Sequence, residues 1–285
     1  MRLFLLCISY VLIVLSGCQS NSNYRQRQIE GDIRSAISQG KHAEVINQLI
    51  LQADDPSKAA VAGVWEIMYL EHIPDQIKLT WAYYQEKPPS STRCSEIFEV
   101  INRYKISVLR VLIHHGVDVN RHYYGSPLVM WGCPGWGTPP MTPSLLAFLL
   151  ENGYNPNLNG DFQSALGFCA CPGQSFLKYE QKYEMMKMLL KHGANPNVIS
   201  GGKPILHQLA TPYQRDNPCL LEMIQLLLDE GADVNFLNEE GKTPLDTAMQ
   251  YRSHPPGKDE LVNKIIHCLE SSGGNKSDEI QLSHK

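Results

Sequence analysis

The sequence of 285 residues has little of what marks the commoner classes of enzyme, membrane protein and nucleic-acid-binding protein. It contains no G-x-S-x-G nucleophile motif and no phosphate-binding glycine loop. A membrane-spanning helix needs roughly 20 apolar residues, and the N-terminal apolar run covers only residues 3–15. Charge is balanced, with 25 Lys and Arg against 29 Asp and Glu, whereas nucleic-acid binding requires a clustered basic surface. We therefore expect a non-enzyme that uses no cofactor, small-molecule substrate or nucleic acid.

The N-terminal segment predicts export and anchoring. Arg2 supplies a positive start, an apolar run follows, and Leu15-Ser16-Gly17-Cys18 closes it. This closing motif resembles the lipobox of bacterial lipoproteins, in which the cysteine is lipidated and the signal peptide is cut before it. The resemblance implies a signal peptide over residues 1–17, a palmitate-bearing anchor at Cys18 and, because Gln19 follows, an outer-membrane protein that faces the periplasm. An ordinary signal peptide with an incidental cysteine is the alternative.

Internal repetition dominates the second half of the sequence. Four segments share an apolar helical stripe, a glycine and a short run ending in asparagine: residues 108–120, 145–157, 185–197 and 223–235. The glycine stands where a helix needs a left-handed residue at its end, at Gly116, Gly153, Gly193 and Gly231. Two residues later, a side-chain acceptor tightens the following turn, at Asp118, Asn155, Asn195 and Asp233.

A shorter helix is expected before each stripe, and its start often has a hydroxyl residue or a proline. These starts are Ser126-Pro127-Leu128, Ser164-Ala165-Leu166, Pro204-Ile205-Leu206-His207 and Thr243-Pro244-Leu245. Together with the glycine turns, they resemble the ankyrin repeat and its T-P-L-H-x-A signature. The resemblance implies an all-α ankyrin-repeat solenoid of stacked helix pairs. The closing asparagines are 37, 40 and 38 residues apart. Because the family period is about 33, we expect elongated inter-helix loops.

The resemblance is firm over residues 106–250 and loose before residue 105. We expect six or seven helix pairs in all. After the signal peptide, the predicted order is a tether at residues 18–27, degenerate helical repeats at 28–105, ankyrin repeats at 106–271 and a flexible tail at 272–285.

Six cysteines remain once the signal peptide and Cys18 are set aside, and export would place them in an oxidising compartment. Long loops in neighbouring repeats predict a disulfide from Cys133 to Cys171 or from Cys94 to Cys133. The full set of disulfide candidates is Cys94, Cys133, Cys169, Cys171 and Cys219. Cys268 is expected to be a buried thiol. No metal site is expected, because structural zinc sites space their paired cysteines more widely than Cys169-x-Cys171.

The histidines favour a structural role over a metal or acid–base role. His115 and His192 directly precede turn glycines, a position where ankyrin repeats often carry histidine. His207 occupies the histidine position of the ankyrin signature. The resemblance implies that its ring hydrogen-bonds to backbone in the neighbouring turn.

Stacked repeats create an extended concave surface, on which we expect a protein partner to bind. The candidate residues lie in the variable column of the signature, at the turn tips and in a glycine-rich loop. They are Arg121, His122, Tyr123, Tyr124, Met130, Trp136, Phe162, Phe168, Gln208, Glu239 and Glu240. The alternative for Met130 and Phe168 is packing against the next repeat.

Two function classes fit such a surface: inhibition of a protein partner, or a general envelope scaffold or stress-protective role. In location and architecture the protein resembles immunity proteins that block envelope-targeting toxins, such as phospholipases.

Overall fold

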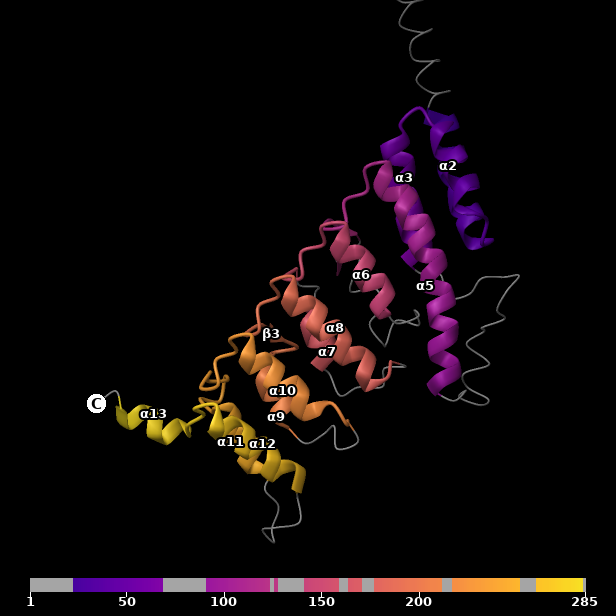
Figure 1. The fold of residues 1–285 in the computed structure, drawn as a ribbon. Helices are drawn as coiled ribbons and strands as arrows, with labels where there is room; N and C mark the ends of the chain where they lie inside the picture. The colour runs from indigo at the N-terminus through magenta and orange to yellow at the C-terminus, as the bar shows by residue number, and fades with distance from the viewer. Residues whose placement is uncertain are drawn as a thin grey trace, which may run out of the picture. The chain divides into compact units, whose positions relative to one another are not determined.

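The computed structural model describes residues 23–68, 91–123, 126–127, 141–158, 164–170, 177–211, 217–251 and 260–283. The chain divides into two compact units (Figure 1). Unit 1 comprises Met1–Pro88 and Val100–Asp118, and unit 2 comprises Pro89–Glu99 and Val119–Lys285. The described part of the chain is helical apart from short two-residue strand pairs and turns, so the expected all-α class is confirmed.

Unit 1 is built from a helix over residues 23–38, followed by α2 (Ala43–Leu51), α3 (Pro56–Met68) and the later part of α5 (Ser91–His114). Its core is rich in isoleucine, because each helix turns one apolar face inward: Ile33, Ile37, Ile46, Ile50, Ile67 and Ile101 are fully buried. Gly63 in α3 allows the helices to approach closely, since a Cβ there would lie 3.0 Å from Ile37 Cδ1 and 3.3 Å from Leu112 Cδ2.

Two side-chain contacts join the parts of unit 1. The Tyr104 hydroxyl donates to the Lys41 carbonyl at 2.9 Å, and burial raises the pKa of this phenol to about 12. His115 Nε2 lies 2.8 Å from Asn47 Oδ1, as a structural histidine would. Residues 23–27, which fall in the stretch for which a tether was expected, are helical.

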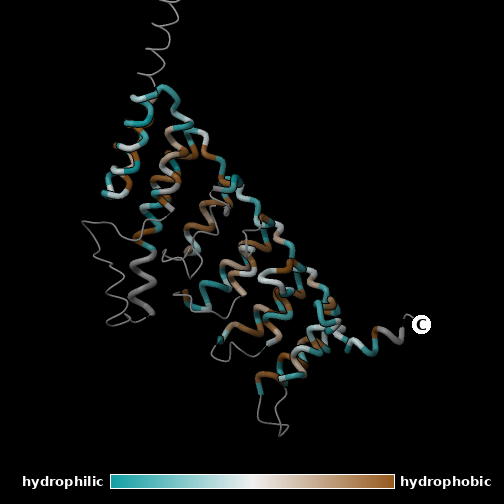
Figure 2. Tube along the Cα trace, turned by 180° about the vertical axis from the view of Figure 1, so that it is seen from behind, coloured by the Kyte–Doolittle hydropathy of each residue, from teal (hydrophilic) through white to brown (hydrophobic). Residues whose placement is uncertain are grey.

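Unit 2 contains two rows of helices. The first row is α6 (Pro143–Glu151), α8 (Tyr179–Lys191), α10 (Leu220–Asp229) and α12 (Glu260–Ser271). The second row is α7 (Ala165–Ala170), α9 (Ile205–Ala210) and α11 (Pro244–Gln250). Neighbours contact one another within each row and between the rows, so the apolar faces are shared (Figure 1). Figure 2 shows hydrophobic residues concentrated in these helices and hydrophilic ones along the turns.

Short antiparallel strand pairs project between consecutive repeats of unit 2. β1 (His122–Tyr123) pairs with β2 (Ser126–Pro127), and β3 (Ile199–Ser200) pairs with β4 (Lys203–Pro204). Ser126 and Pro127, expected to open a helix, are therefore strand residues, and the helix expected after them lies outside the described residues. The unaltered Thr243-Pro244 start does open α11: Thr243 Oγ1 accepts from Asp246 N, and Asp246 Oδ2 accepts from Thr243 N.

The C-terminal segment continues the repeat pattern beyond the expected boundary. Gly273 follows α12 with φ 88°, as the other turn glycines do, and α13 (Ser277–Ser283) comes next. We expected a flexible tail from residue 272. The structure instead places a fifth turn there, which the sequence pattern did not reveal because Ser277 replaces the closing asparagine.

Candidate partner-binding surface

A ladder of asparagine side chains ties successive turns of unit 2 together. Asn157 illustrates the arrangement: its Nδ2 donates to the Gly193 carbonyl at 2.8 Å, and its Oδ1 accepts from Asn195 N at 2.7 Å. The same paired contacts are made by Asn120 to the turn at Gly153, by Asn197 to the turn at Gly231, and by Asn235 to the turn at Gly273. Each repeat thus uses its closing residue to satisfy two backbone groups of the next turn.

Three of these turns are also closed within themselves. Asn155 Oδ1 accepts from Asn157 N at 3.0 Å, Asn195 Oδ1 accepts from Asn197 N at 2.9 Å, and Asp233 Oδ1 accepts from Asn235 N at 2.9 Å. This confirms the acceptor role expected for the residue two positions after the glycine. The turn glycines at 116, 153, 193 and 231 all have positive φ, between 83° and 93°, which confirms the other half of the pattern. The turns are therefore preorganised.

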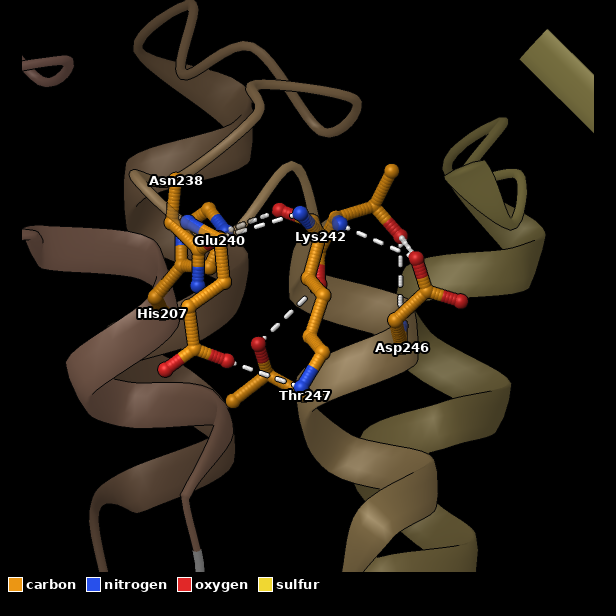
Figure 3. A network of polar contacts seen from close by, with 7 residues as sticks. His207, Asn238, Glu240, Lys242, Asp246 and Thr247 are labelled. Atoms are coloured by element: carbon orange, nitrogen blue, oxygen red, sulfur yellow. Dashed lines mark hydrogen bonds and ion pairs between the residues drawn. The ribbon is translucent and has the colours of Figure 1, made fainter. Parts of the chain in front are cut away.

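The loop of residues 237–242, called here the finger loop, is held by the polar network in Figure 3. Asn238 Oδ1 accepts from Glu240 N and Lys242 N, each at 3.0 Å. The Lys242 carbonyl accepts from Asn238 N at 2.9 Å and lies 3.0 Å from Nε2 of the buried His207 ring. The backbone bond expected for His207 is thus confirmed. Burial lowers the pKa of this imidazole, although the Lys242 carbonyl and the Asp246 carboxylate act in the opposite direction.

The β3–β4 hairpin is fastened in a similar way. Gln208 Nε2 donates to the carbonyls of Ser200 and Lys203, at 2.7 and 3.0 Å. Ser200 Oγ accepts from Ser164 N at 3.0 Å, which ties the hairpin to the start of α7. Gln208, expected to contact a partner, therefore has its amide engaged in holding the hairpin.

Two exposed apolar side chains stand on these fastened turns. Ile199 is 53% exposed and Leu237 is 43% exposed. Each lies two residues after a ladder asparagine, Asn197 or Asn235, so the two occupy equivalent positions of consecutive repeats. The two side chains offer apolar contact area on preorganised turns, although apolar residues that are exposed singly are normal on protein surfaces.

Charged groups lie on the same two turns. Glu239 and Lys203 are exposed, and Lys242 Nζ lies 2.8 Å from Glu240 Oε2. The Lys242 hydrogen bond and charge, together with the more distant Lys203, lower the pKa of Glu240. Ionic groups of both signs therefore share the β3–β4 hairpin and the finger loop with Ile199 and Leu237.

The predicted binding residues differ in exposure. Arg121, His122, Glu239 and Glu240 are exposed, as expected. Phe168 is only 3% exposed within α7, so the packing alternative holds and this residue cannot anchor a partner. Tyr123 lies in β1 without a described side chain, and Tyr124, Met130, Trp136 and Phe162 lie outside the described residues. Sequence reasoning missed Ile199 and Leu237, although their matching spacing after the closing asparagines was a usable signal.

The cysteine predictions are largely beyond the described part of the chain. Cys18, Cys133 and Cys171 lie outside it, and Cys94 lies in α5 without a described side chain, so the two preferred disulfides stay predictions. Cys169 and Cys219 carry thiols in this structure. Cys268 is also a thiol, as expected, but it is half-exposed rather than buried and lies 3.6 Å from Gln225 Oε1.

Among the described residues, no group of three or more His, Cys, Asp or Glu side chains is placed to hold a metal ion. Within the same ranges, none of the helices combines the length and apolarity needed to cross a membrane.

Comparison with known proteins agrees with this architecture. Residues 201–239, which include α9, α10 and the next turn, match the family model of the ankyrin repeat. This segment is recognised as an ankyrin repeat. An ankyrin repeat protein of fowlpox virus (strain NVSL) is 27% identical over 161 residues, which are 54% of this chain and 20% of that protein. The chain therefore spans about a fifth of that relative.

A solved ankyrin repeat domain from Acinetobacter baumannii AYE is 20% identical, with a TM-score of 0.46 over 77% of this chain and 97% of that one. The fold of the present protein is the expected all-α ankyrin-repeat solenoid. Ankyrin repeats indicate a protein-binding scaffold and are generally modules of interaction rather than catalysis.

Proposed function

We propose that this protein is a lipid-anchored, periplasm-facing inhibitor of a protein partner, and specifically an immunity protein against an envelope-targeting toxin such as a phospholipase. The observation that carries the proposal is the pairing of Ile199 and Leu237 on turns that the asparagine ladder fixes in place. A surface that is already ordered loses little conformational entropy on binding, so a modest apolar contact can contribute strongly to affinity. Such a surface suits a tight inhibitor.

The lipobox-like motif supports the anchored location. Acyl chains on Cys18 would hold the repeats beside the membrane that the toxin attacks. Confinement to the membrane surface raises the effective concentration of the inhibitor near its target. Labelled palmitate should be incorporated into the wild-type protein and lost from Cys18→Ala. Equal labelling of both proteins would refute the anchor while leaving the binding proposal standing.

The functional test uses the product of the neighbouring gene. That product is expressed in the periplasm with and without this protein, and growth and membrane integrity are followed. Co-purification of the two proteins as a one-to-one complex, together with restored growth, is the expected result. A neighbour that is harmless in the periplasm, or toxicity that this protein leaves unchanged, would refute immunity. A general scaffold would then be the better account, and would show several envelope partners in place of one.

A further inference from the structure

Two exposed apolar side chains lie in the described part of unit 1 that is closest in sequence to Cys18. Tyr24, near the start of the helix over residues 23–38, is 72% exposed, and Leu51, the last residue of α2, is 57% exposed. A hydrogen bond links the two residues that follow them: Arg25 Nη2 donates to the Gln52 carbonyl at 3.3 Å. Tyr24 and Leu51 therefore directly precede the two residues that this bond joins.

A second contact fixes the same end of the unit. The buried Gln26 side chain donates to the Asp55 carbonyl at 3.2 Å and accepts from Asp55 N at 3.1 Å. Arg25 and Gln26 are therefore bound to the connection between α2 and α3. Tyr24 and Leu51 stand beside residues that these hydrogen bonds hold in place.

The position of this end relative to the proposed anchor decides what covers it. Cys18 lies five positions before residue 23, the first residue of this helix that the structure describes. An extended chain advances at most about 3.6 Å per residue, so residue 23 would lie within about 18 Å of the lipidated residue. A tether of that length would hold this end of unit 1 near the bilayer surface.

The chemistry of the patch suits that layer. Tyrosine is enriched at membrane–water interfaces, where its ring meets the acyl boundary and its hydroxyl stays hydrated. The exposed Arg25, Arg27 and Lys58 favour anionic headgroups, but Asp54 and Asp55 at the same end offset most of that charge. The apolar side chains, rather than a polybasic cluster, therefore provide the contact.

We propose that Tyr24 and Leu51 form a membrane-contact patch through which the anchored protein rests on the periplasmic face of the lipid bilayer. This inference rests on the lipid anchor of the proposed function. The contact would orient the first helix pair on the bilayer and give the chain a second, reversible attachment beside Cys18.

Tryptophan placed at position 24 provides the test. Tyr24→Trp protein is reconstituted in vesicles of phosphatidylethanolamine and phosphatidylglycerol that carry bromine on the upper part of the acyl chains. Bromine quenches only tryptophans in close contact with it. The matched control is Ser35→Trp, because Ser35 is exposed and lies three turns further along the same face of the same helix, about 16 Å away. The emission of the four native tryptophans is subtracted using the wild-type protein.

Two preparations distinguish the membrane contact of Tyr24 from the effect of the lipid anchor on Cys18. One is the lipidated protein extracted from membranes, and the other is the chain from residue 19 with an N-terminal His tag, held on nickel-chelating lipid. We expect the added emission of Tyr24→Trp to fall by about half or more in both, and that of Ser35→Trp to stay unchanged. If the molecular mass of the protein extracted from membranes shows no lipid on Cys18, the anchor alone is refuted. Equal quenching of the two variants on the nickel-chelating vesicles would overturn the contact.

Discussion

Ser200 occupies the space beside Gly167 that any larger residue would need. A Cβ on Gly167 would lie 2.0 Å from Ser200 Oγ and 2.3 Å from Ser200 Cβ. Both Ser200 and the neighbouring Ser164 are 3% exposed, and Ser164 Oγ accepts from Gly167 N at 3.0 Å. The hairpin that displays Ile199 is therefore seated directly on α7, and glycine is required at the contact.

Gly167→Ala should destabilise unit 2 because the methyl group must displace a buried hairpin. Overpacking of this kind typically costs about 1–3 kcal/mol in the free energy of unfolding. Urea unfolding followed by circular dichroism measures it. Gly167→Ala combined with Ser200→Gly should recover part of the loss. A single variant as stable as the wild type would show that the hairpin moves freely.

Removing one rung of the asparagine ladder should also lower stability. Asn157→Ala loses the contacts to Gly193 O and Asn195 N, which join two repeats. A net contribution of about 1 kcal/mol per hydrogen bond predicts a loss of about 1–2 kcal/mol. Asn263→Ala, at an exposed position of α12, is the matched control and should change little. If both variants unfold at the same urea concentration, the ladder does not stabilise the array.

His207 should make unit 2 less stable in mild acid. Its ring is buried, Nε2 faces the Lys242 carbonyl, and Nδ1 has no hydrogen-bond partner. Its pKa is lowered from 6.5 in the folded state, so the unfolded chain binds the proton first as the pH falls below 6.5. The free energy of unfolding therefore decreases with falling pH until the folded ring is itself protonated.

Thermal unfolding of His207→Gln tests this pH dependence, because glutamine keeps a donor for Lys242 O but does not titrate. Between pH of about 7.5 and about 5.5, the wild type should lose more stability than His207→Gln. His267→Gln, at an exposed position of α12, controls for loss of a histidine elsewhere and should behave like the wild type. Parallel pH profiles for wild type and His207→Gln would contradict the assignment.

The sequence predicts a disulfide between neighbouring inter-helix loops, with Cys133–Cys171 or Cys94–Cys133 as first choices. Such a bond typically stabilises a domain by about 2–4 kcal/mol. Peptide mass mapping of the periplasmic protein without reductant will show whether it forms. Six thiols in the mature chain would refute the prediction. Cys268 is partly buried and burial raises the pKa of its thiol, so it should be alkylated more slowly than a free thiol.

The sequence was sufficient for what is local to one repeat. Gly153 and Asn155 stand in a turn whose geometry depends on neighbouring residues alone, so the pattern predicted both the positive φ and the acceptor role. His207 was also predicted correctly, because the family resemblance supplied its partner in the next turn. The fifth turn was missed because Ser277 interrupts the pattern, although the backbone around Gly273 follows it.

Features that depend on contacts between repeats were harder to predict from the sequence. The bond from Asn157 to Asn195 joins residues 38 positions apart, and no local pattern gives the distance between two turns. Phe168 was offered as an anchor, yet whether a helix side chain points to solvent or to the next repeat depends on packing that spacing does not determine. The spacing after Asn197 could have marked the position of Ile199, but the 53% exposure of its side chain comes from the structure.

A protein partner should bind at Ile199 and Leu237, and the affinity of the partner for a double variant at these positions tests this most directly. The toxic neighbour is titrated calorimetrically with the wild type, with Ile199→Asp/Leu237→Asp, and with Val45→Asp. Val45 is the matched control because it is 44% exposed in unit 1, close to the 43% of Leu237. An interface anchor contributes about 2 kcal/mol or more, so the double variant should bind at least about 30-fold more weakly while Val45→Asp binds as the wild type does. Wild-type affinity in the double variant, with its fold intact by circular dichroism, would contradict the account.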